Sequence, residues 1–350
     1  MEDKKNQEQV QEREKIKYTS KDFSSSQDVR WCPGCGDYSI LAQMQRSSPE
    51  FGVKIEDVVW ISGIGCAARF PYYMSTYGFH GIHGRAPAIA TGVKLNNPSL
   101  SVWVATGDGD LMSIGGNHFI HACRRNIDIK ILLFNNRIYG LTKGQYSPTS
   151  EKGKKTKSTP FGSVDFPFNP LELAIGSGAT FVARSLDRDA KHLQAMMKRA
   201  NEHKGTAFIE VFQNCNIFND GAFDQLTDKD TKADHVLVLE HGKPMVYGKS
   251  MDKAIRINGL TPEVIDLSNG KYSLSDAWIH DEFDPNPMRS HIIAHLSDMD
   301  GFPTPIGVLK QEKKSTYDED FHKQIEGVKQ SRGEGDLRKL LFSGNMWEVN

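Results

Sequence analysis

The sequence lacks the features that would assign it to a broad class at once. No stretch of its 350 residues approaches the roughly 20 consecutive apolar residues that cross a bilayer, and no apolar signal region follows the charged amino-terminus. The formal net charge is −1, so there is no overall positive field to hold nucleic acid or an anionic membrane. We therefore expect a cytoplasmic protein that recognises its partners locally, with no nucleic acid and no membrane among them.

Cysteine is scarce, and its number is odd. Five cysteines in a chain of this length argue against a framework of disulfide bonds. Cys123 lies in an apolar helical stretch, where we expect it to pack as a small hydrophobe. The other four lie in glycine-rich or polar loops, which suits ligands of zinc or of an iron–sulfur cluster, and the CPGC pair alone also permits a redox disulfide. The residue pattern by itself favours zinc for these four, which are Cys32, Cys35, Cys66 and Cys215.

The order of apolar runs and polar loops predicts an α/β fold with a doubly wound, mostly parallel sheet. Apolar runs typical of strands occur at 58–62, 101–110, 129–137 and 206–212, with helical patterns between them and a helix from about Asp37, which can cap it. The α/β unit is expected to end near Phe212. We divide the chain into a charged tail (1–28), either disordered or a solvated docking helix, a main domain (29–220) and a C-terminal extension (221–350).

Two motifs follow neighbouring strands of the expected sheet. GDGDL spans 107–111, and NN occupies 135–136. Loops that follow parallel strands emerge at the same edge of a sheet, so the two motifs can meet in space. The carboxylate of Asp108, the side-chain oxygen of Asn136 and the carbonyl of Ile138 suit a small hard cation such as Mg²⁺, which completes its shell with phosphate oxygens. The sequence therefore predicts a magnesium–diphosphate site.

The pairing of GDG with NN resembles the thiamine diphosphate motif. The resemblance implies that Asp108, Asn136 and the Ile138 carbonyl hold the Mg²⁺ that anchors the diphosphate. It also makes candidates for binding the cofactor of the residues that flank these ligands and of two glycine-containing loops, namely Gly109, Asp110, Leu141, Thr142, Ile64, Gly65, Cys66, Ala67, His83, Gly84 and Arg85.

A longer series of motifs resembles the β subunit of 2-oxoacid:ferredoxin oxidoreductases, most closely the 2-oxoglutarate type. The motifs are WCPGCGDYSIL, GIGCAARF, HGIHGRAPAIATGVKLNNP, GDGDLMSIGGNHFIHACRRN and NNRIYGLTKGQYSPTS. They cover roughly 29–224, and weaker similarity continues through HDEFDPNP and PTPIGV. In this family four cysteines at these places bind one 4Fe-4S cluster, so the resemblance replaces zinc with a cluster held by Cys32, Cys35, Cys66 and Cys215.

The resemblance implies the oxidative decarboxylation of a 2-oxoacid, with coenzyme A as co-substrate and ferredoxin as electron acceptor. The expected substrate is 2-oxoglutarate, with pyruvate or a branched-chain 2-oxoacid as alternatives, and the physiological direction stays open. A distal carboxylate on the substrate needs a cation, for which Arg69 and Lys143 are candidates, and His83 can hydrogen-bond substrate or phosphate. A rival from another class is a zinc-stabilised, non-catalytic binding or scaffold protein.

Two further expectations concern partners. The glutamate that thiamine enzymes place beside the aminopyrimidine ring is not found, so the resemblance implies an α subunit that completes the site in a heterodimer or a dimer of heterodimers. Residues 221–350 are expected to pack on that subunit. From Thr142 to Pro170 the chain reads as a long covering loop. Its lysine run, Lys152 to Lys157, is interpreted as a solvated segment, or less favourably as a docking surface for acidic ferredoxin.

Overall fold

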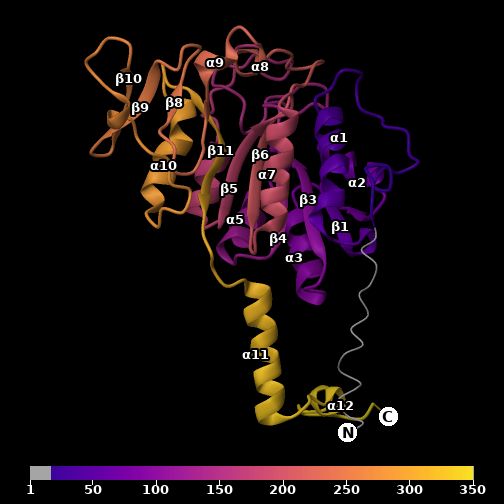
Figure 1. Cartoon of the computed structure of the whole chain (residues 1–350). Coiled ribbons are helices and arrows are strands. Elements are labelled where there is room, and N and C mark those ends of the chain that lie inside the picture. The colour runs from indigo at the N-terminus through magenta and orange to yellow at the C-terminus, as the bar shows by residue number, and fades with distance from the viewer. Residues whose placement is uncertain (1–16, 350) are drawn as a thin grey trace.

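One eight-stranded sheet organises the chain in the computed structural model, which describes residues 17–349 (Figure 1). The strand order is β2-β1-β3-β4-β6-β5-β11-β7, and every neighbouring pair is parallel except β5 and β11. The predicted α/β fold with a mostly parallel sheet is therefore confirmed. The strands are β1 Val58–Ser62, β2 Tyr77–His80, β3 Ser101–Gly107, β4 Ile129–Asn135, β5 Phe181–Leu186, β6 Ala207–Phe212, β7 Val236–Val238 and β11 Thr304–Gln311.

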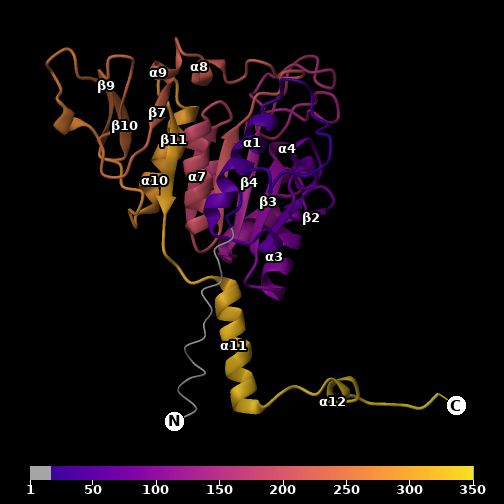
Figure 2. The same cartoon turned by 45° about the vertical axis from the view of Figure 1, so that its right-hand side comes forward.

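Helices cover both faces of this sheet, because its strands are apolar on both sides (Figures 1 and 2). Along β3, for example, Val102 and Val104 join one core while Trp103 and Ala105 join the other. The first core is closed by α3 (Ala86–Asn96), α5 (Gly116–Arg124), α6 (Pro170–Gly176) and α10 (Pro287–His295). The second is closed by α1 (Asp37–Ser47) and α7 (Ala190–Glu202), which pack side by side.

The remaining elements are short or lie outside the main sheet. A three-stranded antiparallel sheet, in the order β10-β9-β8, lies beside α10 (Figure 1). Its strands are β8 Val246–Tyr247, β9 Lys253–Asn258 and β10 Thr261–Asp266. The other helices are α2 Phe70–Tyr73, α4 Asp108–Leu111, α8 Asp224–Thr227, α9 Lys232–His235, α11 Tyr317–Arg332 and α12 Leu337–Leu341, with 3-10 turns at Ser48–Phe51, Ile55–Asp57, Ala67–Arg69, Leu274–Asp276 and Leu296–Asp298.

The expectation that the α/β unit ends near Phe212 is wrong. The strands β11 and β7, both from beyond residue 220, complete the main sheet at its β5 edge. Ile306, Val308 and Leu309 of β11 are almost fully buried, so a short apolar run far along the chain supplies a strand of the core. The main sheet therefore draws on residues from both sides of the expected boundary at 220.

The charged tail expected to reach residue 28 is shorter. Its residues 1–16 lie outside the described part of the chain, but Phe23 is fully buried, with its ring 5.7 Å from that of Tyr18. The next residue, Ser24, forms a β-bridge with Met74. The chain is therefore folded by residue 23, because one aromatic side chain anchors a segment that is otherwise polar.

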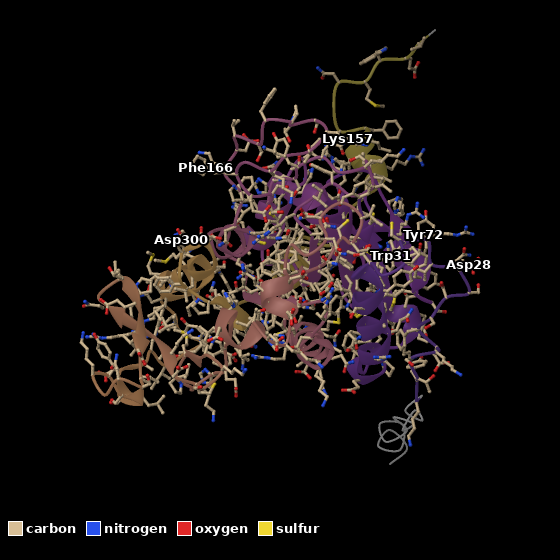
Figure 3. All side chains as sticks on the ribbon, turned by 90° about the horizontal axis from the view of Figure 1, so that it is seen from above. Asp28, Trp31, Tyr72, Lys157, Phe166 and Asp300 are labelled. Carbon is tan, nitrogen blue, oxygen red and sulfur yellow. The ribbon has the colours of Figure 1, made fainter. Side chains whose placement is uncertain are left out.

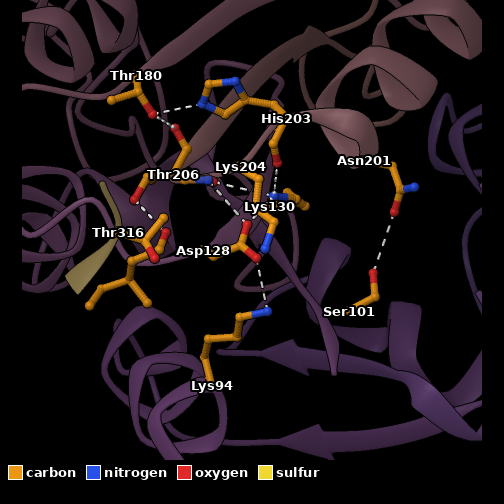
Figure 4. A network of polar contacts seen from close by, with 12 residues as sticks. Lys94, Ser101, Asp128, Lys130, Thr180, Asn201, His203, Lys204, Thr206 and Thr316 are labelled. Atoms are coloured by element: carbon orange, nitrogen blue, oxygen red, sulfur yellow. Dashed lines mark hydrogen bonds and ion pairs between the residues drawn. The ribbon is translucent and has the colours of Figure 1, made fainter. Parts of the chain in front are cut away.

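A buried polar network closes the amino edge of the sheet (Figure 4). Asp128, just before β4, forms ion pairs with Lys130 at 2.6 Å and Lys94 at 2.9 Å, and Lys130 also donates to the carbonyl of His203 at 2.5 Å. Asp318 of α11 accepts a hydrogen bond from the backbone of Asp128 at 3.0 Å. The helix α11 is therefore anchored at the amino edge, and from there it projects away from the body (Figures 1 and 2).

No helix within residues 17–349 combines the length and the apolar character needed to span a membrane.

The network makes stability depend on pH through His203. Burial, with nearby Lys130 adding to the effect, lowers the pKa of His203 from 6.5 to about 4. The unfolded chain binds this proton near pH 6.5, so the stabilisation is complete above that pH and is lost as the pH falls towards 4. We expect the binding of this proton to lower the free energy of unfolding by on the order of 3 kcal/mol as the pH falls from 6.5 to about 4.

Urea unfolding of the wild type and of His203→Gln between pH 4 and 7 measures this contribution. Glutamine can still hydrogen-bond Thr180, whose hydroxyl lies 2.7 Å from Nε2 of His203, but it does not titrate. The variant should show the shallower pH dependence, and equal slopes for the two proteins would contradict the assignment.

Candidate cofactor site

A cavity of about 340 Å³ opens where β1, β3 and β4 end at their carboxyl termini, the edge opposite α11. Its wall is built from the loops that follow these strands and β2, together with the start of α1. The lining residues are Asp37, Ile64, Gly65, Cys66, Ala67, His83, Gly107, Asp108, Gly109, Asp110, Phe134, Asn136, Ile138, Tyr139, Gly140, Leu141 and Thr142.

The two sequence motifs meet in this wall. Asp108 begins α4 directly after β3, Asn136 follows β4, and β3 and β4 are parallel neighbours. Asn136 donates to Gln213 at 2.8 Å, and its side-chain oxygen accepts from the backbone of Ile138 at 3.2 Å. The three predicted magnesium ligands therefore line one cavity.

The carboxylate of Asp108 is buried, with its Oδ2 held by two hydroxyl groups. Ser147 donates to this oxygen at 2.5 Å and Thr149 at 2.7 Å. Burial raises the pKa of Asp108, and these hydrogen bonds oppose the rise. A cation in the cavity would favour the charged carboxylate, so this donor set fits a hard divalent ion.

Gly109 is a position where a side chain has no room. A Cβ there would lie 2.2 Å from the ring of Tyr139, whose hydroxyl donates to the carbonyl of Gly109 at 2.9 Å. The second glycine of GDGDL therefore lets the tyrosine pack directly on the main chain of α4. Its backbone remains accessible to a group bound in the cavity.

Asp110 ties the surrounding loops together. Its Oδ1 accepts from the backbone of Gly84 at 2.7 Å and of Ile64 at 3.2 Å, and it lies 2.8 Å from Nδ1 of His83. Its Oδ2 accepts from Thr106 at 2.9 Å. The loops after β1 and β2 are thus fastened to α4 by one carboxylate. The sequence predicts that Asp110 binds the cofactor. In the structure, four groups of the chain itself already contact its carboxylate.

Four other candidates lie outside this cavity. Arg85 precedes α3, and a Cβ at Gly84 would lie 2.5 Å from the backbone of Gly115, so both belong to the supporting loop. Arg69 lines an adjoining cavity of about 340 Å³, which shares Ile64, Gly65 and Leu141 with the first. Lys143 is exposed and does not line either cavity.

The four loop cysteines gather behind the cavity, and Cys66 belongs to its wall. A Cβ at Gly140 would lie 3.5 Å from Sγ of Cys215 and 3.9 Å from Sγ of Cys66. Burial raises the pKa of Cys66 to about 12, with contributions from the charges of Asp37, Cys215 and Cys32. Burial likewise raises the pKa of Cys35, to which Cys215 and Cys66 also contribute. All five cysteines are free thiols, and Cys123 is fully buried as expected.

The thiols are not arranged as the ligands of a bound zinc ion. Tetrahedral zinc with bonds of about 2.3 Å holds its sulfur ligands roughly 3.8 Å apart. Among residues 17–349, no three cysteine sulfurs lie within 4.8 Å of one another. Four converging thiols are also a donor set that fits an iron–sulfur cluster.

Sequence reasoning missed several residues of the site. Asp37 is expected to cap a helix, but Gly36 is the N-cap residue and no side chain caps α1. Asp37 instead lines the cavity with both carboxylate oxygens buried, and they find no hydrogen-bond partner in the described chain. Burial and nearby Asp187 raise its pKa to about 7. Ser147 and Thr149 were also missed, and the hydroxyl-rich SPTS segment was their only signal.

Figure 3 looks down on this end of the molecule. The long loop after β4, which carries Lys157 and Phe166, extends along one part of it, and Trp31 and Tyr72 lie at another. Trp31 donates its indole N–H to the carbonyl of Cys66 at 2.7 Å, which fixes the loop where the cavity meets the thiols.

Measurements of stability can test whether Asp110 holds the surrounding loops together. Asp110→Ala leaves buried N–H and hydroxyl donors unpaired, so we expect it to lower the free energy of unfolding by about 2–4 kcal/mol, whereas Asp110→Asn keeps an acceptor and should cost about 1–2 kcal/mol. Urea unfolding provides the measurement. Asp28→Ala, which removes an exposed carboxylate, is the matched control. Equal stability of the two alanine variants would show that the contacts of Asp110 do not stabilise the fold.

Comparison with known proteins covers both the site and the whole chain. A family model described as thiamine pyrophosphate enzyme, C-terminal TPP binding domain, matches residues 59–211, which include strands β2 to β5, most of β6 and both motif loops. The 2-oxoglutarate oxidoreductase subunit KorB of Mycobacterium tuberculosis is 49% identical over 332 residues, 94% of this chain and 88% of that protein. A 2-oxoacid:ferredoxin oxidoreductase subunit beta of a Sulfolobus species is 50% identical over 192 residues, 54% of this chain and 63% of its own length.

A solved structure is similar over nearly the full length. It is a 2-oxoglutarate:ferredoxin oxidoreductase from Magnetococcus marinus with 2-oxoglutarate, coenzyme A and succinyl-CoA bound. It matches with a TM-score of 0.75 and 31% identity, over 95% of this chain and 98% of its own. The resemblance found in the sequence motifs is confirmed, and this chain belongs to the family of 2-oxoacid:ferredoxin oxidoreductase β subunits.

Proposed function

We propose that this chain, with an α subunit, oxidatively decarboxylates 2-oxoglutarate in the presence of coenzyme A to give succinyl-CoA and CO₂, and delivers the electrons to ferredoxin. The observation that carries the proposal is that one cavity borders both the GDG and NN loops and a group of four thiols, with Cys66 belonging to both. Free thiols also suit a reducing compartment, so the proposal includes a cytosolic location.

The proposed cofactors are thiamine diphosphate, Mg²⁺ and one 4Fe-4S cluster. Asp108, Asn136 and the carbonyl of Ile138 would hold Mg²⁺, and the cavity wall would hold thiamine diphosphate, which supplies an electron sink for decarboxylation. A cluster supplies a one-electron carrier, and its ligands would be Cys32, Cys35, Cys66 and Cys215.

Several contacts within the chain hold the residues of this site in place. Ser147 and Thr149 hold the carboxylate of Asp108 by hydrogen bonds. Ala67, Phe134 and Ile138 give the cavity apolar wall that limits the access of water, which strengthens electrostatic interactions inside it. The hydrogen bond from Trp31 to the carbonyl of Cys66 fixes the segment shared by the cavity and the thiols.

The proposal includes an α subunit that covers the mouth of the cavity. Apolar side chains are exposed around this end, among them Leu141 at 46%, Phe166 at 78% and Phe161 at 98% exposure. Exposed apolar surface of this kind is typical of an interface. Packing of the C-terminal extension on the α subunit stays a prediction, supported by exposed Leu340 and Trp347 beyond α11.

The assembled enzyme, purified anaerobically with its α subunit, tests the proposal. Iron and acid-labile sulfide should be present at about four each per β subunit if one cluster is bound. Reduction of ferredoxin should require coenzyme A and be fastest with 2-oxoglutarate in a panel that includes pyruvate and branched-chain 2-oxoacids. Preference for pyruvate would overturn the substrate assignment, and a colourless protein that contains zinc and no iron would favour the scaffold alternative.

Cysteine variants provide the matched control. Cys66→Ala should lose iron, sulfide and ferredoxin reduction. Cys123→Ala, which removes a thiol buried in the core, should retain all three. Loss of iron in both variants would contradict the assignment of the ligands.

Arg69 is the preferred residue for the distal carboxylate of 2-oxoglutarate, since its cavity adjoins the first. Arg69→Gln removes a charge-assisted hydrogen bond worth about 2 kcal/mol, so we expect KM for 2-oxoglutarate to rise roughly thirtyfold. KM for pyruvate, which lacks that carboxylate, should change little. Arg30→Gln in the same cavity is the control, because Arg30 is exposed and paired with Asp28. A similar rise of KM for both substrates would exclude this role.

A further inference from the structure

The long loop after β4 contacts the proposed metal site from behind. Its hydroxyl groups at Ser147 and Thr149 are buried, and both donate to the same oxygen of Asp108, Oδ2, at 2.5 and 2.7 Å. No side chain among the described residues donates to the other oxygen, Oδ1. The side-chain donors therefore engage one oxygen of the carboxylate, and no side chain of the described residues competes with a cavity ligand for the other.

Thr149 also lies beside a chain of buried polar groups. Its hydroxyl lies 2.9 Å from Oδ1 of Asn135, and Asn135 donates to Glu210 at 2.7 Å. Glu210 forms a buried ion pair with Arg184 at 2.6 Å. These side chains connect the sheet interior, across β4, β6 and β5, to the loop. The hydroxyl has a single proton, and the charged carboxylate of Asp108 is the stronger acceptor for it.

The arrangement limits how Asp108 can bind a metal. A carboxylate with Oδ2 occupied by two donors can offer only one oxygen. Mg²⁺ demands near-octahedral geometry and takes single oxygens, whereas Ca²⁺ accepts six to eight ligands and often binds carboxylates through both oxygens. Two hydroxyl groups behind the carboxylate therefore favour the smaller ion.

We infer that Ser147 and Thr149 are positioning residues that restrict Asp108 to a single metal-binding oxygen, and so raise the affinity of the site for Mg²⁺ relative to Ca²⁺. This inference rests on the proposed function. It gives the long loop a second role besides lining the cavity through Leu141 and Thr142. It also explains why hydroxyl-bearing residues of a surface loop are buried.

Metal titration tests the inference on the assembled enzyme, stripped of metal and thiamine diphosphate. Binding of thiamine diphosphate is measured by calorimetry as a function of Mg²⁺ or of Ca²⁺. In Ser147→Ala and Thr149→Val, the half-saturating Mg²⁺ concentration should rise about tenfold and the half-saturating Ca²⁺ concentration less than threefold. Thr149→Ser keeps the hydroxyl and should restore the wild-type value for Mg²⁺.

Two controls make the result decisive. Ser158→Ala removes an exposed hydroxyl of the same loop, which lies 3.1 Å from the hydroxyl of Thr156, and should leave both titrations unchanged. Thermal unfolding of each variant checks that it is folded. Unchanged Mg²⁺ dependence in folded Ser147→Ala and Thr149→Val would overturn the inference, and so would equal weakening for the two metals, which indicates a merely structural role.

Asp108→Asn separates this inference from the proposed function. If the wild type binds thiamine diphosphate with Mg²⁺ and Asp108→Asn does not, the metal site stands, and the hydroxyl variants alone decide the inference. If the wild type fails to bind the cofactor, or Asp108→Asn binds it as well as the wild type, the proposed function fails first.

Discussion

Parallel pairing of β1, β3, β4 and β6 is the constraint on which the site depends. Cys66, Asp108, Asn136 and Cys215 each follow one of these strands, although 149 positions separate the first from the last. The strands end nearly in register, since Ser62 pairs with Ala105 and Asn135 with Phe212. Groups far apart in the sequence therefore reach the same edge without long or flexible connections.

Two buried aspartates of one short helix have different roles at this edge. Asp108 and Asp110 are almost fully buried, yet Asp110 is surrounded by donors from three segments of the chain, whereas Asp108 is engaged on one oxygen. Burying a carboxylate costs free energy unless its charge is compensated. Asp110 therefore holds the surrounding loops together, and Asp108 retains a capacity to bind a ligand. The local sequence alone does not distinguish them.

The sequence allowed the central strands, the helices between them and the meeting of the two motifs to be predicted, because each rests on a local pattern. The contribution of β11 and β7 could not be predicted, since pairing of Val308 with Ala183 across more than a hundred residues leaves no local signal. The roles of Ser147 and Thr149 also leave no local signal, because their hydroxyl groups donate to Asp108, about forty residues earlier in the chain. Asp37 was assigned to a cap because helix patterns do not reveal which way a first-turn carboxylate faces.

Gly140 separates the cavity from the thiol group. This residue lines the cavity on one side, and on the other the sulfurs of Cys66 and Cys215 lie within 4 Å of where its Cβ would be. The barrier at this point is a single thickness of main chain. A Cβ here would be in ordinary van der Waals contact with both sulfurs, whereas a longer side chain would crowd them. A glycine here thus lets the cavity and the thiols share one stretch of main chain.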